Sequence, residues 1–148
     1  MQKALSVVSH SEEETAALAQ RIAVFLRPGD TLVLTGQLGA GKTVFVRGLA
    51  KGLGIDEDSV NSPSFTMVNE YPGGKLPLYH FALYRIGDTS ELTEIGWYDY
   101  LGRDGIVVVE WGEKAEGYLP GGYYQVIFAA VGEAERQIDI SFVEAVRP

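Results

Sequence analysis

The pattern of apolar and polar residues along this chain predicts strands and helices in alternation. Residues 4–8 form a short apolar run that predicts a first strand. Ser11, with Glu14 three residues later, is typical of a capping box, so we expect a helix to begin there and to end at Pro28-Gly29. The predicted apolar face of this helix consists of Leu18, Ile22, Phe25 and Leu26.

A second strand and a second helix are predicted on either side of a glycine-rich segment. Residues 31–35 read as a buried strand that leads directly into the glycines. Beyond them, a helix is predicted to end at Gly54, where glycine commonly terminates helices. Its predicted apolar face, at i, i+3, i+4 and i+7 spacing, consists of Val46, Leu49, Ala50 and Leu53.

The rest of the chain predicts two hairpins and one fully buried strand. Turn-forming residues separate residues 65–71 from 76–85, and 123–131 from 136–144, so each pair is expected to form an antiparallel hairpin. The continuous apolar run 106–109 is typical of a central strand that is buried on both faces.

Two short helices are predicted before that central strand, one capped by Asp88 and Glu91 and one over residues 97–101. Together these elements predict an α/β protein in which helices flank a mostly parallel central sheet with antiparallel hairpin additions. The sequence has no internal repeat and no low-complexity linker. Residues 1–148 are therefore expected to form a single domain.

The glycine-rich segment carries the strongest functional signal. It reads Gly36-Gln37-Leu38-Gly39-Ala40-Gly41-Lys42-Thr43. Gly, any four residues and then Gly-Lys-Thr is the P-loop pattern, in which backbone N–H groups surround the phosphates of a nucleotide. Lys42 is expected to contact the β- and γ-phosphates, and the Thr43 hydroxyl to bind Mg²⁺. The predicted strand before the loop and the predicted helix after it are the context that the motif requires, so the α/β protein is expected to have the P-loop NTPase fold.

Glu110 is the candidate for the second acidic group that a P-loop enzyme needs. It directly follows the apolar run 106–109, at the end of a strand, where such enzymes place a carboxylate that holds Mg²⁺. A glutamate at a strand end can also be an ordinary surface residue. We favour the metal-binding interpretation because the same chain carries a P-loop.

The remaining polar and aromatic candidates carry weaker signals. Ser62, Ser64 and Thr66 lie where a loop could sense the γ-phosphate, but ordinary turn chemistry explains them equally well. Arg85 and Arg103 could stabilise the transferred phosphoryl group. Ion pairing or solvation is the simpler explanation for both arginines.

Trp97, Trp111 and His80 are interpreted as structural residues. Large aromatic side chains usually belong to a core, so we expect both tryptophans to be buried. His80 lies in a predicted strand and shares a face with Ala82 and Tyr84. It is expected to be a hydrogen-bonded structural residue rather than a base.

Composition restricts the classes of function. The net charge of −8 gives little basis for a basic face that would hold nucleic acid directly. The chain has no cysteine and two histidines, which excludes disulfides, thiol catalysis and histidine-rich metal sites. No apolar run is long enough to span a membrane, and the N-terminal residues do not resemble a signal peptide, so a soluble, cytoplasmic protein is expected.

Four segments in this order resemble the TsaE family of bacterial P-loop ATPases, also called the YjeE family. They are the P-loop above, Asn61-Ser62-Pro63-Ser64-Phe65-Thr66, the run from Tyr79 to Arg85, and Val109-Glu110-Trp111. The resemblance covers nearly the whole chain. It implies binding of ATP and Mg²⁺, and a role with the TsaD and TsaB subunits of the threonylcarbamoyl transferase complex. That complex forms N6-threonylcarbamoyladenosine in tRNA next to the anticodon, so contact with tRNA would be indirect.

The resemblance also implies roles for individual residues. Lys42 and Thr43 take the P-loop roles and Glu110 becomes the acidic Mg²⁺ partner, while Thr15 and Arg136 fall where the family approaches the nucleotide base. The family's aspartates are replaced here by Gln37 in the P-loop and by Ala82 in the strand. Their loss removes two carboxylates near the expected metal and water. It predicts normal ATP binding with weak intrinsic hydrolysis that depends on the partner complex.

Three other functions could use a P-loop. A small-molecule kinase usually has a lid that carries several arginines, and the seven arginines here are scattered. A GTPase would carry the guanine-reading Asn-Lys-x-Asp pattern, which is missing. A nucleotide-dependent assembly module with negligible hydrolysis remains compatible with Gln37 and Ala82. ATP turnover with and without the partner complex distinguishes it from an active ATPase.

Overall fold

The alternation of strands and helices is present in the computed structural model, which describes residues 2–36, 41–63, 67–115 and 117–144. The strands are β1 (Gln2–Ser9), β2 (Thr31–Gly36), β3 (Val68–Tyr71), β4 (Leu78–Ala82), β5 (Ile106–Glu110), β6 (Tyr123–Ala130) and β7 (Arg136–Val143). The helices are α1 (Glu12–Ala23), α2 (Lys42–Gly52), α3 (Glu91–Glu94) and α4 (Trp97–Leu101), with short 3-10 helices η1 (Glu57–Ser59) and η2 (Gly112–Ala115).

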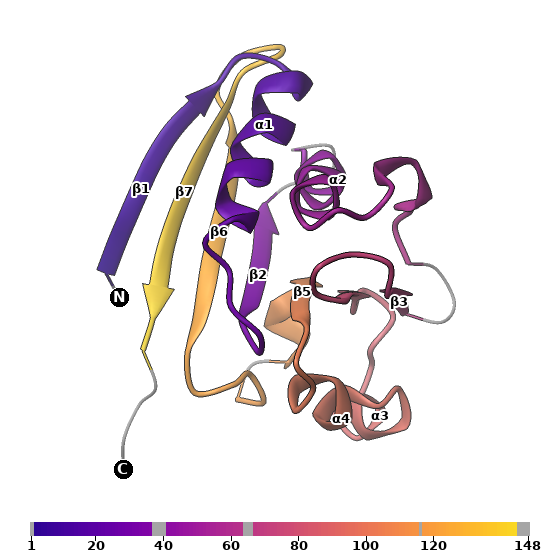
Figure 1. Cartoon of the computed structure of the whole chain (residues 1–148). Helices are drawn as coiled ribbons and strands as arrows, with labels where there is room; N and C mark the ends of the chain where they lie inside the picture. Colours follow the sequence, from indigo (N-terminus) through magenta and orange to yellow (C-terminus); the bar gives the residue numbers. More distant parts are fainter. Residues whose placement is uncertain (1, 37–40, 64–66, 116, 145–148) are drawn as a thin grey trace.

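The strands form one sheet in the order β1-β7-β6-β2-β5-β4-β3 (Figure 1). The four central strands, β6, β2, β5 and β4, run parallel, and the outer pairings are antiparallel. This confirms the predicted α/β fold. Both predicted hairpins are present as β3–β4 and β6–β7. The second hairpin is not a simple terminal addition, because β6 pairs with β2 and β7 pairs with β1.

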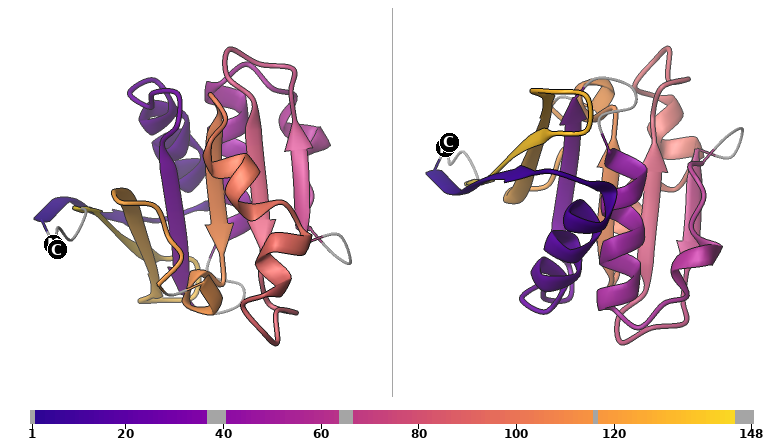
Figure 2. Two further views of the ribbon diagram at one scale, coloured as in Figure 1. Left: turned by 90° about the horizontal axis from the view of Figure 1, so that it is seen from below. Right: turned by 90° about the horizontal axis from the view of Figure 1, so that it is seen from above.

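Helices cover the sheet on both faces, with α1 and α2 on one face and α3 and α4 on the other (Figure 2). Strand β5 contributes to both cores. Ile106 and Val108 belong to the cluster under α1 and α2, whereas Val107 and Val109 belong to the cluster that contains Trp97 of α4. This two-sided burial explains the continuous apolar run, since neither face of a central strand meets water.

Helices α1 and α2 pack closely against each other. A Cβ atom added at Gly48 of α2 would lie 2.3 Å from the carbonyl oxygen of Ala16 and 2.8 Å from the Cβ of Ala19 in α1. Contact at that distance is possible only because Gly48 lacks a side chain. At the N-terminal end of α2, a Cβ atom built at Gly41 would lie 3.9 Å from Cγ2 of Thr15, so α1 also lies beside the residue where α2 begins.

The prediction for the end of α1 was wrong. The helix ends at Ala23 rather than at Pro28-Gly29, and Phe25 is 79% exposed instead of buried. After Ala23 the chain makes tighter, three-residue turns, because the N–H groups of Val24 and Phe25 bond to the carbonyls of Arg21 and Ile22. The α-helix therefore ends before Phe25. Leu18, Ile22 and Leu26 do pack partly buried against the core, as expected. Among the helices of the described residues, none is long and apolar enough to cross a bilayer.

Candidate functional site

Glycines permit the turn between β2 and α2. Gly36, the last residue of β2, has φ 144°, and a Cβ there would lie 2.6 Å from the carbonyl oxygen of Phe128 on β6. Gly41 caps α2 with φ 100°, a left-handed conformation that residues with a Cβ atom rarely adopt. Lys42 is the first residue of α2, as predicted. The positive end of the helix dipole therefore lies at Lys42 and Thr43.

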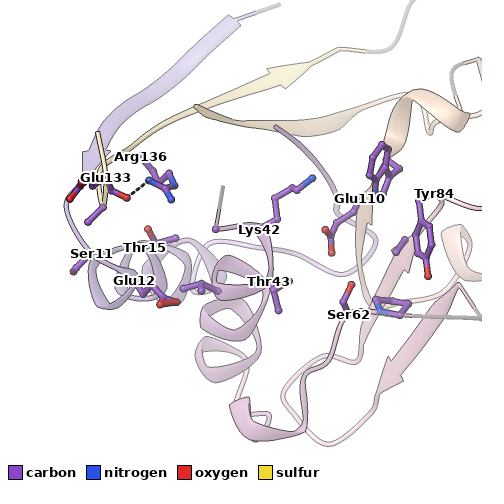
Figure 3. Close-up of a pocket in the computed structure, with 16 residues that line it drawn as sticks. Ser11, Glu12, Thr15, Lys42, Thr43, Ser62, Tyr84, Glu110, Glu133 and Arg136 are labelled. Atoms are coloured by element: carbon purple, nitrogen blue, oxygen red, sulfur yellow. Dashed lines mark hydrogen bonds between the residues drawn. The ribbon is translucent and has the colours of Figure 1, made fainter. Parts of the chain in front are cut away.

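This helix terminus opens into a pocket of about 900 Å³. The pocket brings together seven of the residues predicted from the sequence, which are Thr15, Gly41, Lys42, Thr43, Ser62, Glu110 and Arg136. Figure 3 shows Lys42 and Thr43 at its centre, with Glu110 facing them from β5 and with Thr15 and Arg136 at the opposite end. The volume is in the range that accommodates a nucleotide-sized ligand.

Some predicted site residues lie outside the described residues. These are Gln37, Leu38, Gly39 and Ala40 of the P-loop motif, and Ser64 and Thr66 of the switch-like segment. Ser62, the remaining member of that segment, is exposed and lines the pocket between Thr43 and Tyr84 (Figure 3). The segment therefore begins at the pocket, beside the predicted phosphate site.

Lys42 is buried against two groups of the chain. Its Nζ donates a 3.0 Å hydrogen bond to the carbonyl oxygen of Gly36 and lies 5.4 Å from the centre of the Trp111 ring. Both contacts stabilise a positive charge, the second through the electron-rich face of the indole. The ammonium group is thus held at the edge of the pocket.

The expectation that Trp111 belongs to the core was wrong, whereas the same expectation for Trp97 is confirmed. Trp111 is 39% exposed and lines the pocket. It follows the last residue of β5 and has φ 63°, so the chain turns there and its side chain leaves the inward and outward alternation of the strand. Trp97 is fully buried, and its Nε1 donates a 2.9 Å hydrogen bond to the carbonyl oxygen of Tyr118.

Glu110 ends β5, the parallel neighbour of the P-loop strand β2, where it is the register partner of Leu34. It lines the pocket but is only 6% exposed. Its Oε2 atom lies 2.6 Å from Nε2 of His80, which is itself fully buried on β4. The prediction that His80 is a hydrogen-bonded residue is correct for Nε2, whereas the buried Nδ1 has no hydrogen-bond partner in the described part of the chain. Its partner, the carboxylate expected to hold Mg²⁺, was not foreseen.

Ala82 lies next to this pair. It is the register partner of Glu110 across β4 and β5, and it lines the pocket with a methyl group. The face of β4 that carries His80 and Ala82 is therefore directed toward the pocket that Lys42 and Thr43 line. An acidic side chain at Ala82 would stand beside Glu110, whereas the methyl group offers no hydrogen bond.

The opposite end of the pocket is formed by the start of α1 and the β6–β7 turn. The Thr15 hydroxyl lies 2.7 Å from that of Ser9, within hydrogen-bonding distance. Arg136 donates to the carbonyl oxygens of Glu133 and Glu135, which ties it to the turn (Figure 3). Both predicted base-binding residues therefore have defined positions, at the far end from Glu110.

The predicted cap of α1 is present in a modified form. Ser11 Oγ accepts a 3.1 Å bond from the N–H of Glu14, as a capping box requires. The Glu14 carboxylate accepts from the N–H of His10, one residue before the cap, instead of from Ser11. This backbone hydrogen bond lowers the pKa of the Glu14 carboxyl. The cap fixes the segment that places Thr15 in the pocket.

The two candidate arginines have surface contacts. Arg103 forms ion pairs with Glu70 and Asp99 and stacks on Tyr100, which makes it part of a charged cluster between α4 and β3. The simpler explanation, ion pairing, therefore holds for Arg103. Arg85 donates a 3.4 Å hydrogen bond to the hydroxyl of the adjacent Tyr84.

Parallel strands β2 and β5, with a helix that begins at the lysine of a Gly-Lys-Thr motif, define the P-loop class of α/β proteins. Comparison with protein families narrows this class. Residues 9–138 match the family model described as "Threonylcarbamoyl adenosine biosynthesis protein TsaE". The match spans most of the sequence, and the chain belongs to the TsaE family.

Individual relatives agree with this assignment. The chain is 46% identical to the Bacillus subtilis tRNA threonylcarbamoyladenosine biosynthesis protein TsaE, over 88% of this chain and 81% of that protein. It is 41% identical to the TsaE protein of Nostoc, with the same shares covered. The crystal structure of Bacillus subtilis YdiB superposes with a TM-score of 0.76 at 38% identity, over 95% of this chain and 86% of that one.

Proposed function

We propose that this protein is an ATPase that binds ATP with Mg²⁺ and supports the formation of N6-threonylcarbamoyladenosine in tRNA. The observation that carries the proposal is one shared pocket. The N-terminus of α2 and the Glu110 carboxylate line it and face each other. A cationic helix end and a strand-end carboxylate are the two halves of a nucleotide–metal site. Membership of the TsaE family supports threonylcarbamoyladenosine biosynthesis as the process in which the site acts.

The chain's own groups suggest how ATP would be bound. Backbone N–H groups at the start of α2 and the Lys42 ammonium would bind the phosphates, which are stronger acceptors than the Gly36 carbonyl that Lys42 now contacts. The nucleoside would extend toward Thr15 and Arg136, because these residues line the end of the pocket away from Glu110.

Thr43 and Glu110 fit Mg²⁺ as protein ligands. Both offer oxygen, which Mg²⁺ prefers, and Mg²⁺ in nucleotide enzymes usually takes only one or two protein ligands beside phosphate oxygens and water. Among the described residues, no three His, Asp or Glu side chains form a cluster that could hold a metal. That agrees with a metal that arrives with the nucleotide. When bound, Mg²⁺ neutralises charge on the phosphates.

The TsaD and TsaB subunits of the threonylcarbamoyl transferase complex are the proposed partners. A net charge of −8 favours indirect contact with tRNA, because a chain that bound RNA alone would need a basic surface. The cytoplasm is the proposed location, since the tRNA and the transferase act there.

ATP turnover on mixing with TsaB, TsaD and tRNA tests this proposal. We expect slow turnover by the protein alone and faster turnover with the partners. Turnover that stays negligible in the full mixture, with ATP still bound, would favour the second candidate, a nucleotide-dependent assembly module. The methyl group of Ala82 beside Glu110 is the specific observation behind that candidate. Absence of ATP binding would contradict both.

Partner binding should depend on the nucleotide if the segment that begins at Ser62 responds to the γ-phosphate. A ligand shifts a conformation only when it binds one state better than another. The affinity for the TsaB–TsaD pair should therefore differ between ATP and ADP. Equal affinities with ATP, with ADP and without nucleotide would reject this switch.

A further inference from the structure

His80 and Glu110 form a buried pair behind the pocket. His80 is fully buried and Glu110 is 6% exposed, with 2.6 Å between Nε2 and Oε2. A carboxylate that holds Mg²⁺ is ionised and can only accept hydrogen bonds, so in that state Nε2 carries the proton and donates it. A short hydrogen bond to a charged acceptor is among the stronger side-chain contacts in proteins.

The second ring nitrogen of His80, Nδ1, differs from Nε2. Nδ1 is buried and has no hydrogen-bond partner within the described part of the chain. A buried polar atom without a partner destabilises the fold, so an apolar side chain at this place in β4 would serve the core better. The contact with Glu110 is what the histidine provides that leucine could not.

The register of the sheet explains the geometry. His80 pairs with Val108 and Ala82 pairs with Glu110 across the parallel strands β4 and β5. His80 thus lies one pleat deeper in the sheet than the pocket and reaches diagonally to the carboxylate. His80 contacts Glu110 on the side away from the pocket, whereas Glu110 itself lines the pocket.

We propose that His80 is a positioning residue that fixes the orientation of the Glu110 carboxylate for Mg²⁺. This inference rests on the proposed nucleotide and metal binding. A carboxylate already held in one orientation does not need to be ordered when the metal arrives, and loss of such an outer partner typically weakens metal affinity about 10- to 100-fold. His80 would act through Glu110 and not on the substrate.

Calorimetric titration of ATP at increasing Mg²⁺ concentrations tests the role without relying on turnover. Two variants remove the contact, His80→Leu and His80→Asn, whose amide is too short to reach the carboxylate. His80→Gln is the rescue variant, because its longer amide can donate near the place of Nε2. Leu78→Val is the control, since Leu78 is a fully buried residue of the same strand. Thermal unfolding of each variant measures any loss of stability.

We expect both disrupting variants to bind ATP without Mg²⁺ as the wild type does, and to need about 10- to 100-fold more Mg²⁺ for the tighter binding. His80→Gln should recover most of this loss, and Leu78→Val should show none. An unchanged Mg²⁺ requirement in His80→Leu or His80→Asn would overturn the inference while leaving the proposed function intact. Loss of the fold in both would assign His80 to the core alone. A wild type that does not bind ATP would overturn the proposed function and this inference with it.

Discussion

The ammonium nitrogen of Lys42 lies 3.0 Å from the carbonyl oxygen of Gly36, so the first residue of α2 is bonded back to the last residue of β2. The bond holds the lysine, which lines the pocket, in one position. A neutral carbonyl is a weaker acceptor for this charge than a phosphate oxygen. In the proposed complex with ATP, Lys42 would exchange the Gly36 carbonyl for a phosphate oxygen.

Lys42→Ala should weaken ATP binding about tenfold or more. A charge-assisted hydrogen bond contributes about 1.5–3 kcal/mol, and about 1.4 kcal/mol corresponds to a factor of ten in affinity. Lys51→Ala is the matched control, because Lys51 lies in the last turn of the same helix and pairs with Glu57 at the surface. Calorimetric titration measures both. Equal ATP affinities of the wild type and Lys42→Ala would show that Lys42 does not bind the phosphates.

Glu110→Gln should strongly reduce turnover while preserving the fold. The glutamine carbonyl can still accept from His80, so the buried hydrogen bond survives and only the negative charge is lost. Glu113→Gln in the adjacent η2 provides the control for a nearby charge. Turnover in saturating Mg²⁺ is the measurement, with circular dichroism as the check on folding. If Glu110→Gln hydrolyses ATP at the wild-type rate, Glu110 does not act through Mg²⁺ and is an ordinary glutamate at a strand end.

Ala82→Asp should raise ATP turnover in the presence of the partner complex. A group that orients water or accepts a proton contributes about 10²–10⁴-fold, and an aspartate here would recover part of that factor. Because Ala82 is 2% exposed and pairs with Glu110, the second carboxylate should also lower the melting temperature. Ala82→Asn separates charge from size and should not raise turnover. Fast wild-type turnover without any gain in Ala82→Asp would place the water-orienting group elsewhere.

Gly48→Ala should destabilise the protein by about 1–3 kcal/mol, the usual effect of overpacking a well-packed interface. The added methyl group would meet Ala16 and Ala19 across the α1–α2 contact. Gly73→Ala is the control, because no atom lies within 4 Å of a Cβ built there. Chemical denaturation of both variants gives the comparison. A stable Gly48→Ala would mean that α1 can move away from α2 at little energetic expense.

The sequence by itself determined most of the fold and the main candidate groups. Local patterns suffice for these features, because a continuous apolar run such as 106–109 has few alternatives to a buried strand. The spacing of glycines, Lys42 and Thr43 likewise specifies a backbone turn and a helix start. Glu110 could be predicted because its position at the end of an apolar strand is itself a sequence feature.

Only the tertiary structure decided which side chains meet at the pocket. His80 and Glu110 are 30 residues apart, and their contact depends on β4 pairing with β5 in one particular register. Trp111 lies outside the core because its own backbone is left-handed directly after β5. Phe25 is exposed because α1 ends at Ala23. Strand register and chain direction after an element are set by packing between distant segments, which no local pattern of apolar and polar residues contains.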